Sequence, residues 1–391
     1  AFIATTLVSG LSVGSNVIVA QLWGARRHED AGQAARHFLG LSILISLGLL
    51  SLGLLVNRLA MDVLGAQADV IHLALPYSNL IFLLIPFTIL LQVLSSILQG
   101  TGDTKTPMYA MIVVNLLHVA IAIPLIYGHW GLPALGINGA AIAVGIAEAT
   151  GCLYLLTHCR PMLRCSHRFR FDLIRTIWHV GAPVSGERVV QQAGILLYTK
   201  IVLMYGTVAY AAHQVGLSIE SLSFLPGYGF AIAAATMVGQ SIGAGKYTRA
   251  KLETWEANRL AVYMMSAMGV VFFLFPYALL RAFTSDEAVI ELGTLFLKIV
   301  ALLQIPLAFT MVVAGSLRGA GDTRFVMIAT MIGMWGVRIP LAIMAGYWLS
   351  MGVFYVWLAM IADWTLRMAL MLWRHRSERW RSIQVLRSSP T

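Results

Sequence analysis

The stretch Leu-Gln-Gly-Thr-Gly-Asp-Thr-Lys at residues 98–105 recurs as Leu-Arg-Gly-Ala-Gly-Asp-Thr-Arg at residues 317–324. A second motif, Val-Ala-Gln-x-x-Gly-Ala at residues 19–25, recurs as Val-Gly-Gln-x-x-Gly-Ala at residues 238–244. Each copy follows its partner by 219 residues, and two motifs in one register indicate a tandem duplication. Duplicated membrane bundles commonly place a binding site at the interface of their halves.

The composition predicts a membrane protein. Hydrophobic residues make up 59% of the chain and charged residues 11%, with a mean hydropathy of +0.79. A soluble domain carries about 25% charged residues. Long apolar runs alternate here with short charged ones, and a run of about 20 apolar residues is long enough to cross a bilayer. Because lipid offers no hydrogen bonds to the backbone, these runs must be helices. We therefore expect an all-α polytopic fold.

Eleven transmembrane helices are predicted from the apolar runs. They cover residues 1–22, 37–57, 71–97, 107–127, 137–156, 178–204, 213–241, 259–280, 289–315, 325–346 and 352–373. The repeat maps residue 1 onto residue 220, so that the run 178–204 has no counterpart in the first copy. The sequence thus predicts two six-helix bundles with eleven of twelve spans present, the first helix of the N-terminal copy being missing.

The distribution of Lys and Arg predicts the topology. The loops between the predicted spans lie alternately on the two sides of the membrane. Among the Lys and Arg residues outside the spans, only Arg58 and Arg281 lie on one side, and all the others lie on the side that contains the long stretch 157–177. The positive-inside rule places the richer side in the cytoplasm. Both copies then enter the membrane from the same side, as parallel repeats related by a pseudo-two-fold axis along the membrane normal. The expected parts are an N-terminal lobe, a cytoplasmic linker, a C-terminal lobe and a basic cytoplasmic tail, at residues 1–156, 157–177, 178–373 and 374–391.

The net charge of +10 does not require a nucleic-acid partner. The basic loops lie where they would face the anionic head groups of membrane lipids. A nucleic-acid-binding protein would show a folded basic domain, and the sequence has none. The three cysteines, Cys152, Cys159 and Cys165, have neither disulfide nor metal-ligand spacing. We therefore expect lipid contact, no nucleic acid and no metal site.

Several motifs resemble those of the multidrug and toxic compound extrusion (MATE) family. They are the two motif pairs above together with Ala-Ala-His-Gln at 211–214, Leu-Pro-Gly at 225–227 and Leu-Gly-Ile-Asn-Gly-Ala-Ala at 135–141. The resemblance covers nearly the whole chain. It implies a multi-pass exporter of the cell (inner or plasma) membrane, not an enzyme, in which two six-helix bundles form a V-shaped central cleft. It also implies that cationic, amphipathic molecules leave as H⁺ or Na⁺ enters, with no cofactor besides this ion. We expect a monomer.

The repeated Gly-Asp-Thr turns have two possible roles. Gly102 and Gly321 can adopt a positive φ and end the preceding helix. Asp103 and Asp322 can then cap the next helix, where the helix dipole favours a negative charge. The first interpretation is therefore a structural turn, and the second is a gating or coupling role as the lobes rock.

Glu220 is the strongest candidate for ion coupling. It lies deep in its apolar run, in Ser-Ile-Glu-Ser-Leu-Ser at residues 218–223. An ionisable group at mid-bilayer costs roughly 2.5–3.5 kcal/mol on insertion scales, so it usually faces the bundle interior or water. A proton carrier must be neutral when occluded and must release its proton on contact with the cytoplasm. The alternative is a structural carboxylate held by neighbouring Ser and Gln side chains.

Glu187 is the second candidate, and Gln191 lies one turn further on the same helix face. The resemblance implies that one branch of the family uses an acidic residue of this helix in its cation site. Alignment from residues 211–214 places that position at Gln191 rather than Glu187. Glu187 can contribute to the cation site from one helical turn away, or it can form an ion pair with Arg188 or with another residue of the lobe.

His118 replaces a residue of a pattern found in some relatives. The resemblance implies an Asn followed four residues later by an Asp in this helix, and these positions are His118 and Ala122 here. The oxygen ligands that a hard cation requires are therefore absent, which favours H⁺ over Na⁺. His118 can itself carry a proton, or it can simply be bonded to a carbonyl or to Asn115. Relatives also often carry an acidic residue in the first helix, which this chain lacks.

The other charges within spans are interpreted as more structural. Asp363 and Arg367 have the i, i+4 spacing of a self-neutralising pair. Arg338 precedes a proline and is expected to pair across helices. For Glu148, the sequence is compatible both with a structural role and with a part in ion coupling or substrate binding.

The predicted function is a secondary active multidrug exporter that works by alternating access and is coupled to H⁺ in preference to Na⁺. One alternative is a flippase for a lipid-linked oligosaccharide, which would favour a cleft rich in Arg and Lys. The other is a membrane scaffold or receptor without transport, in which a buried carboxylate has only a structural role.

Overall fold

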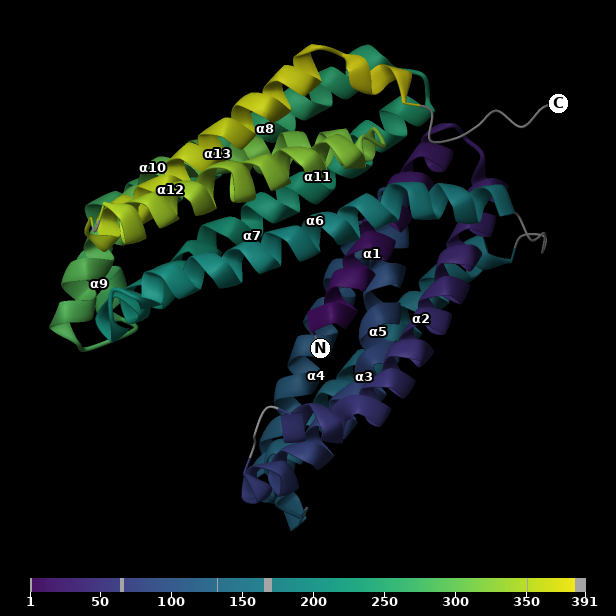
Figure 1. The fold of residues 1–391 in the computed structure, drawn as a ribbon. Coiled ribbons are helices and arrows are strands. Elements are labelled where there is room, and N and C mark those ends of the chain that lie inside the picture. The colour runs from purple at the N-terminus through teal and green to yellow at the C-terminus, as the bar shows by residue number, and fades with distance from the viewer. Residues whose placement is uncertain (1, 64–66, 132, 165–170, 350, 384–391) are drawn as a thin grey trace. The chain divides into compact units, whose positions relative to one another are not determined.

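The computed structural model describes residues 2–63, 67–131, 133–164, 171–349 and 351–383, and its regular elements are all helical there (Figure 1). Contacts divide the chain into two compact units, Ala1–Gly181 and Ala182–Thr391. The all-α fold predicted from the apolar runs is confirmed, with one bundle of long helices in each unit. Each unit is considered on its own below.

The N-terminal unit is built around one central helix. Its elements are α1 (Phe2–Gly24), α2 (His28–Val63), α3 (Ala68–Thr101), α4 (Lys105–Tyr127), the 3₁₀ turn η1 (His129–Gly131) and α5 (Ile137–Leu163). Helix α3 packs against α1, α2, α4 and α5, and α4 also packs along α5. Because α3 is enclosed in this way, its buried face is almost entirely aliphatic.

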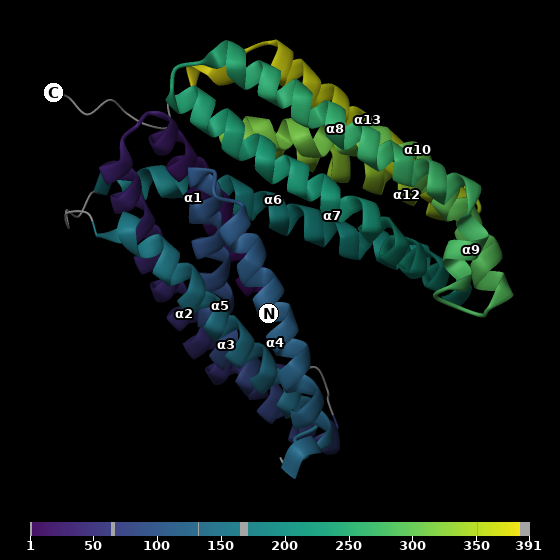
Figure 2. The same ribbon diagram turned by 180° about the vertical axis from the view of Figure 1, so that it is seen from behind.

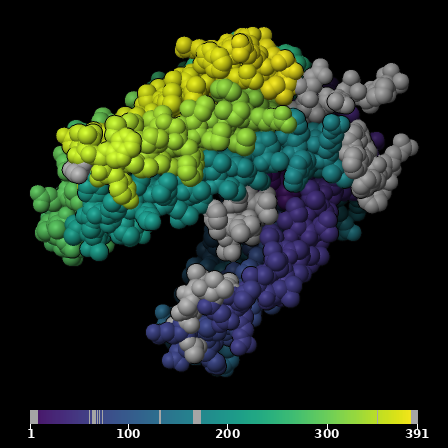
Figure 3. Space-filling view, viewed as in Figure 1, coloured from purple at the N-terminus to yellow at the C-terminus, as the bar shows by residue number. Residues whose placement is uncertain are grey.

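The C-terminal unit has the same kind of arrangement, with α10 at its centre (Figure 2). Its elements are α6 (Phe171–Leu203), which starts before the boundary, α7 (Thr207–Gly243), α8 (Tyr247–Leu274), α9 (Pro276–Arg281), α10 (Glu287–Gly319), α11 (Thr323–Met331), η2 (Ile332–Arg338), α12 (Ile339–Ile343), η3 (Met344–Trp348), α13 (Val353–Arg376) and η4 (Arg379–Ser382). Helix α10 packs against α7, α8 and α13. The segments α11 to η3 form one continuous rod with two π-helical stretches, η2 and η3, and Figure 3 shows this rod and α13 on one side of the unit.

The long helices follow the predicted spans in order. Within the described residues, nine helices are long and apolar enough to cross a membrane; α1 and α6 are not among them. The span predicted at 259–280 is wrong in detail, because α8 ends at Leu274 and the short α9 begins at Pro276. A proline has no N–H to donate and restricts the residue before it, which explains the break at Phe275.

The predicted linker 157–177 is mostly helical where it is described. Helix α5 continues to Leu163 and α6 begins at Phe171, while residues 165–170 of the linker, with Cys165, lie outside the described residues. The predicted tail also begins within structure, since α13 extends to Arg376 and η4 follows it. Loss of hydrophobicity predicts where a helix leaves the membrane, whereas the helix itself can continue beyond the apolar part of its sequence.

The repeat is visible in the backbone of the Gly-Asp-Thr turns. Gly102 has φ 94° and Gly321 has φ 90°, as the sequence predicts. The Gly102 N–H donates to Gln99 O at 2.9 Å, and the Gly321 N–H donates to Arg318 O at 2.8 Å. A side chain at either position would be strained, because the left-handed region favours glycine. The corresponding helices α3 and α10 therefore end in the same way.

A close helix contact is repeated as well. A Cβ added to Gly319 of α10 would lie 2.3 Å from the carbonyl oxygen of Ala235 on α7. A Cβ added to Gly100 of α3 would lie 2.9 Å from the carbonyl oxygen of Asn16 on α1. Both pairs share the 219-residue offset of the sequence motifs. Small residues that let two backbones approach closely are a common basis of helix packing in membranes.

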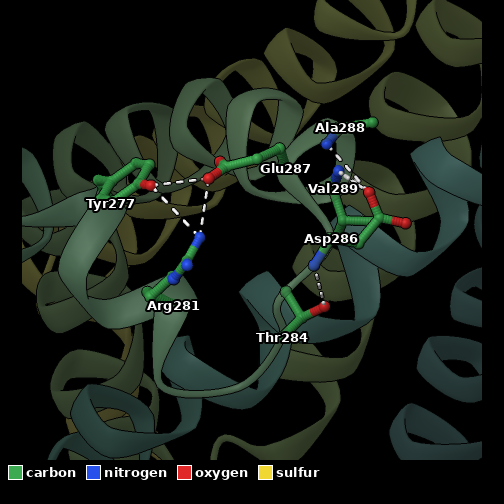
Figure 4. Close-up of polar contacts among 7 residues, drawn as sticks. All are labelled: Tyr277, Arg281, Thr284, Asp286, Glu287, Ala288 and Val289. Atoms are coloured by element: carbon green, nitrogen blue, oxygen red, sulfur yellow. Dashed lines mark hydrogen bonds and ion pairs between the residues drawn. The ribbon is translucent and has the colours of Figure 1, made fainter.

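The start of α10 is fixed by a side-chain cap (Figure 4). Asp286 Oδ1 accepts hydrogen bonds from the N–H groups of Ala288 at 3.0 Å and Val289 at 3.4 Å. Arg281 of α9 forms an ion pair with Glu287 at 2.7 Å, on the surface of the unit. The cap satisfies amide groups that the first helical turn leaves unpaired.

Candidate functional site

A cavity of about 270 Å³ lies inside the C-terminal unit, among α6, α7, η2 and α13. Each of these segments presents side chains three or four residues apart, which places them on one helix face. The lining residues are Gln191, Ile195, Tyr198 and Thr199 of α6, His213, Leu217, Glu220, Ser221 and Phe224 of α7, Met334 and Arg338 of η2, and Met360, Trp364 and Arg367 of α13. The cavity thus has apolar and aromatic walls with a few charged groups.

Glu220 is a carboxylate that lines this cavity. The residue is 7% exposed, so the prediction that it faces the bundle interior is confirmed. Within the described part of the chain, its carboxylate makes neither a hydrogen bond nor an ion pair, and the charge that acts on it is that of Arg338. The neighbouring Ser221 and Ser223 hydroxyls donate elsewhere, to Ser218 O and to Gln304. The Glu220 carboxylate is therefore available to a proton or a ligand.

Three charged residues form a buried cluster beside Glu220. Arg367 donates to both carboxylate oxygens of Asp363, from Nε at 2.5 Å and from Nη2 at 2.9 Å, which confirms the predicted i, i+4 pair. Arg338 lies across from them, with Nε 2.7 Å from Asp363 Oδ2, so its predicted pairing across helices is also confirmed. The approach is close enough for an ion pair, yet Arg338 Nε makes no hydrogen bond to any described residue.

Gly333 provides the space for this cluster. A Cβ at this position would lie 2.2 Å from Asp363 Oδ1 and 2.4 Å from Arg367 Nε. Gly333 belongs to η2, and short π-helical stretches inside α-helices occur frequently at functional sites. The absent side chain and the local π-helix together let the charged side chains of α13 lie directly against the backbone of η2.

A second, smaller cavity of about 60 Å³ contains Glu187. Arg318 donates to Glu187 Oε1 at 2.7 Å and Thr330 donates to the same atom at 3.2 Å. The pairing partner is thus Arg318 rather than Arg188, which instead contacts the hydroxyl of Tyr228. Glu187 Oε2 has no hydrogen-bond partner among the described residues. Gln191 lines both cavities, so it stands between Glu187 and Glu220.

The candidates of the N-terminal unit form a separate group. Glu148 on α5 is half-buried, and Thr88 of α3 donates to its Oε2 at 2.6 Å. His118 on α4 is also half-buried and interacts with Glu148 electrostatically. Asn115 is exposed on the surface of its unit. Among the residues that the structure describes, no hydrogen bond joins His118 to Asn115, and Glu148, His118 and Asn115 do not line the cavities that hold Glu220 and Glu187.

The two aspartates of the repeated turns differ. Asp103 Oδ1 accepts from the Thr106 N–H at 3.0 Å, as predicted for a cap. Burial would raise the pKa of the Asp103 carboxyl, but hydrogen bonds from Thr106 and from the Lys105 N–H outweigh it and hold this pKa below its ordinary value. Asp322 makes no capping bond, contrary to the prediction, because its carboxylate pairs with Arg374 at 2.6 Å.

The sequence does not predict Arg338, Tyr198 or Trp364 as residues of the site. The sequence favours a structural role for Arg338, and the structure shows in addition that its side chain lines the cavity. A signal was present in the spacing, because Trp364 lies one residue after Asp363 and three before Arg367 and so shares their part of α13. No sequence signal identifies Tyr198, whose hydroxyl donates to Val356 O on a distant helix at 2.9 Å.

Comparison with known proteins identifies the family. The family model MatE matches residues 1–123 and 183–344, more than half of the chain. The chain belongs to the MatE family. It is 31% identical, over 98% of its length and 84% of the relative, to the probable multidrug resistance protein NorM of Thermotoga maritima. It is 23% identical, over 99% of its length and 85% of the relative, to the probable multidrug resistance protein YoeA of Bacillus subtilis.

Solved structures agree with the MatE assignment at the level of the fold. A crystal structure of a MATE protein in the straight conformation matches with a TM-score of 0.90 and 20% identity, over 98% of this chain and 86% of that chain. An outward-facing multidrug resistance MATE family transporter matches with a TM-score of 0.90 and 19% identity over the same shares. The resemblance seen in the motifs is confirmed: this MatE protein is a multi-pass membrane protein of a multidrug efflux transporter family.

Proposed function

We propose that this protein exports cationic, amphipathic small molecules in exchange for protons, by alternating access in the inner or plasma membrane. The observation that carries the proposal is the buried Glu220 carboxylate, which lines an amphipathic cavity without a hydrogen-bond partner in the described part of the chain. We also propose that the protein is a monomer and that its linker and C-terminus lie in the cytoplasm. Membership of a multidrug efflux family supports it.

The exchange of substrate for protons is explained by competition between the cationic substrate and a proton for the Glu220 carboxylate. An ionised Glu220 attracts a cationic substrate on the cytoplasmic side, and the aromatic walls add cation–π and apolar contacts. Proton uptake from outside removes the negative charge and leaves Arg338 nearby, so that the cation is repelled and released. Loss of the proton to the cytoplasm restores the affinity. Coupling requires only that the two ligands differ in affinity for the two states.

Protons fit this site better than Na⁺. A hard cation takes several oxygen ligands, whereas the charged groups that line the cavity beside Glu220 are the guanidiniums of Arg338 and Arg367. In the N-terminal unit, the positions of the family's Asn and Asp pattern are occupied by His118 and Ala122. Glu187 is already engaged by Arg318.

Ethidium transport into everted membrane vesicles tests the proposal. An acidic lumen should drive uptake by the wild-type protein, and a Na⁺ gradient at equal pH on both sides should not. Glu220→Gln should abolish the pH-driven uptake. Glu256→Gln is the matched control, because Glu256 forms an exposed surface pair with Arg259. Undiminished uptake by Glu220→Gln would remove Glu220 from the mechanism, and uptake under neither gradient would refute drug export.

A further inference from the structure

The chain turns back against the C-terminal unit after α13. Residues 377–383, which include η4, make this turn, and we call them the strap. Trp380 anchors the strap, since it is only 2% exposed and packs into the apolar cluster that includes Ala250 of α8 and Leu317 of α10. The Trp380 Nε1 donates to His375 O at 3.0 Å. The strap is therefore part of the packing at this end of the unit.

Ion pairs fasten the strap and the end of α13 to other elements. Glu378 of the strap pairs with Lys251 of α8 and, at 2.6 Å, with Arg381. Arg374, in the last turn of α13, pairs at 2.6 Å with Asp322 of the turn between α10 and α11. A gating role is one of the two interpretations of this repeated Gly-Asp-Thr turn. The structure joins the turn directly to α13.

The backbone of the strap is held in a conformation that its sequence does not favour. Glu378 has φ 55° and ψ 10°, in the left-handed region that residues other than glycine adopt rarely. Such conformations persist where the surrounding contacts impose them, and they cluster at ligand clamps and switch regions. The contacts here are the two ion pairs of the Glu378 carboxylate, and the side chains of both are partly exposed. The closed strap therefore depends on contacts that water can replace.

The strap is not repeated in the N-terminal copy. At residues 158–164, which correspond to the strap at the 219-residue offset, α5 continues as a helix as far as Leu163. The copy with the strap is also the one with the buried charged cluster. Arg374 lies seven residues, about two helical turns, after Arg367 of that cluster on the same helix. The strap thus fastens the helix that carries charges into the cavity.

We propose that the strap opens and recloses in each transport cycle, so that α13 is clamped to α8 and to the Asp322 turn in one state of the cavity and released in the other. The inference rests on the proposed export function and adds to it an element that moves. In the open state, Trp380 would lie in the membrane–water interface, where tryptophan is favoured. A ligand that binds one state of the cavity more tightly would then also shift the strap.

A reversible cross-link tests whether the strap must open. Lys251→Cys and Glu378→Cys are combined in a protein whose three native cysteines are replaced with alanine. A short bis-methanethiosulfonate reagent then joins the two thiols in everted vesicles. The cross-link should lower the initial rate of pH-driven ethidium uptake by about 10-fold or more, the result of blocking a conformational step that limits turnover. Dithiothreitol, which cleaves the cross-link, should restore the rate.

Two further cross-links keep the result interpretable. The pair Asp322→Cys and Arg374→Cys locks α13 to the turn before α11, and its cross-link should also block uptake. The pair Arg281→Cys and Glu287→Cys is the matched control, because these residues form an ion pair of similar length away from the strap. Cross-linking of this control pair should leave the rate unchanged.

The outcomes separate this inference from the proposed function. Undiminished uptake by the cross-linked protein would overturn the inference alone. An equal fall on cross-linking the control pair would also overturn it. Loss of uptake in the reduced forms of both strap variants would do the same, because the contacts would then serve the fold throughout the cycle. Absence of ethidium uptake by the wild-type protein would overturn the proposed function and the inference with it.

Discussion

Replacement of Asp363 with Asn tests the physical basis of the charged cluster. Asp363 is fully buried and forms ion pairs with two arginines, with Arg367 Nε at 2.5 Å and Arg338 Nε at 2.7 Å. The substitution keeps the size of the side chain and removes its charge. The two guanidiniums would then face each other in the interior of the C-terminal unit with no counter-charge between them. We expect a large loss of stability in this unit.

The magnitude follows from burial. Two unit charges about 4 Å apart attract by about 4 kcal/mol at an effective dielectric constant of about 20. Asp363 makes two such pairs, and the repulsion between the arginines and the desolvation of all three groups offset part of the gain. Removal of one partner from a buried ion pair costs about 3–5 kcal/mol in measured cases. Asp363→Asn should fall in this range, measured by thermal unfolding of the purified protein in detergent.

Glu287→Gln is the matched control for this measurement. The pair of Arg281 and Glu287 has the same 2.7 Å separation as the pair of Arg338 and Asp363, but its side chains are 51% and 64% exposed. Such a surface pair contributes about 0.2–1 kcal/mol. Equal losses in the two variants would refute the reasoning, because burial would then make no difference. Addition of Arg338→Gln to Asp363→Asn should restore part of the stability, since it removes one of the stranded charges.

Two further predictions concern the repeated turns and contacts. Gly319→Ala should destabilise the protein by about 1–3 kcal/mol, because its Cβ would meet Ala235 O on another helix, whereas Gly229→Ala, with open space around its Cβ, should be neutral or stabilising in the same unfolding assay. Asp103→Ala should cost about 0.5–2 kcal/mol at pH 7 through the lost bond to Thr106. The folded pKa of Asp103 is lowered, so the wild-type advantage should be complete above the pKa of an unfolded aspartate, about 3.9, and disappear as the pH falls through the folded pKa. An advantage that persists well below that folded pKa would contradict this assignment.

Most of the fold could be predicted because apolar run length and repeat register are both explicit in the sequence. The helix ends were predicted less well. Helix α7 begins at Thr207 and α8 at Tyr247, before the predicted starts at 213 and 259. The first turns of α8 are charged, and an i, i+4 pair between Arg249 and Glu253 at 2.8 Å supports them as helix. Hydrophobicity marks the part of a helix that lies in lipid, not the whole helix.

Interactions of the site between residues close in sequence could be predicted, whereas those between residues far apart in sequence could not. The pair of Asp363 and Arg367 is encoded by its spacing, and the burial of Glu220 by its position within an apolar run. The partner of Glu187 could not be inferred, because Arg318 lies 131 residues away on α10. A spacing argument proposes Arg188, its neighbour in sequence, but adjacent residues on a helix point in different directions.

The two copies share their helical architecture, but the charged side chains of the C-terminal cluster are not repeated in the N-terminal copy. At the 219-residue offset, the turns and the close glycine contacts are shared, but Arg338 and Asp363 correspond to Val119 and Val144. Arg367 corresponds to Glu148, so the sign of the charge is reversed there. Burial of an ion costs several kcal/mol even after relaxation, and each copy would bear this cost if both carried the cluster. An alternating-access exchanger needs only one element whose affinity for substrate depends on a bound ion. A charged cavity in one unit would therefore be sufficient for the proposed coupling, and the other unit needs no counterpart of the buried cluster of Arg338, Asp363 and Arg367.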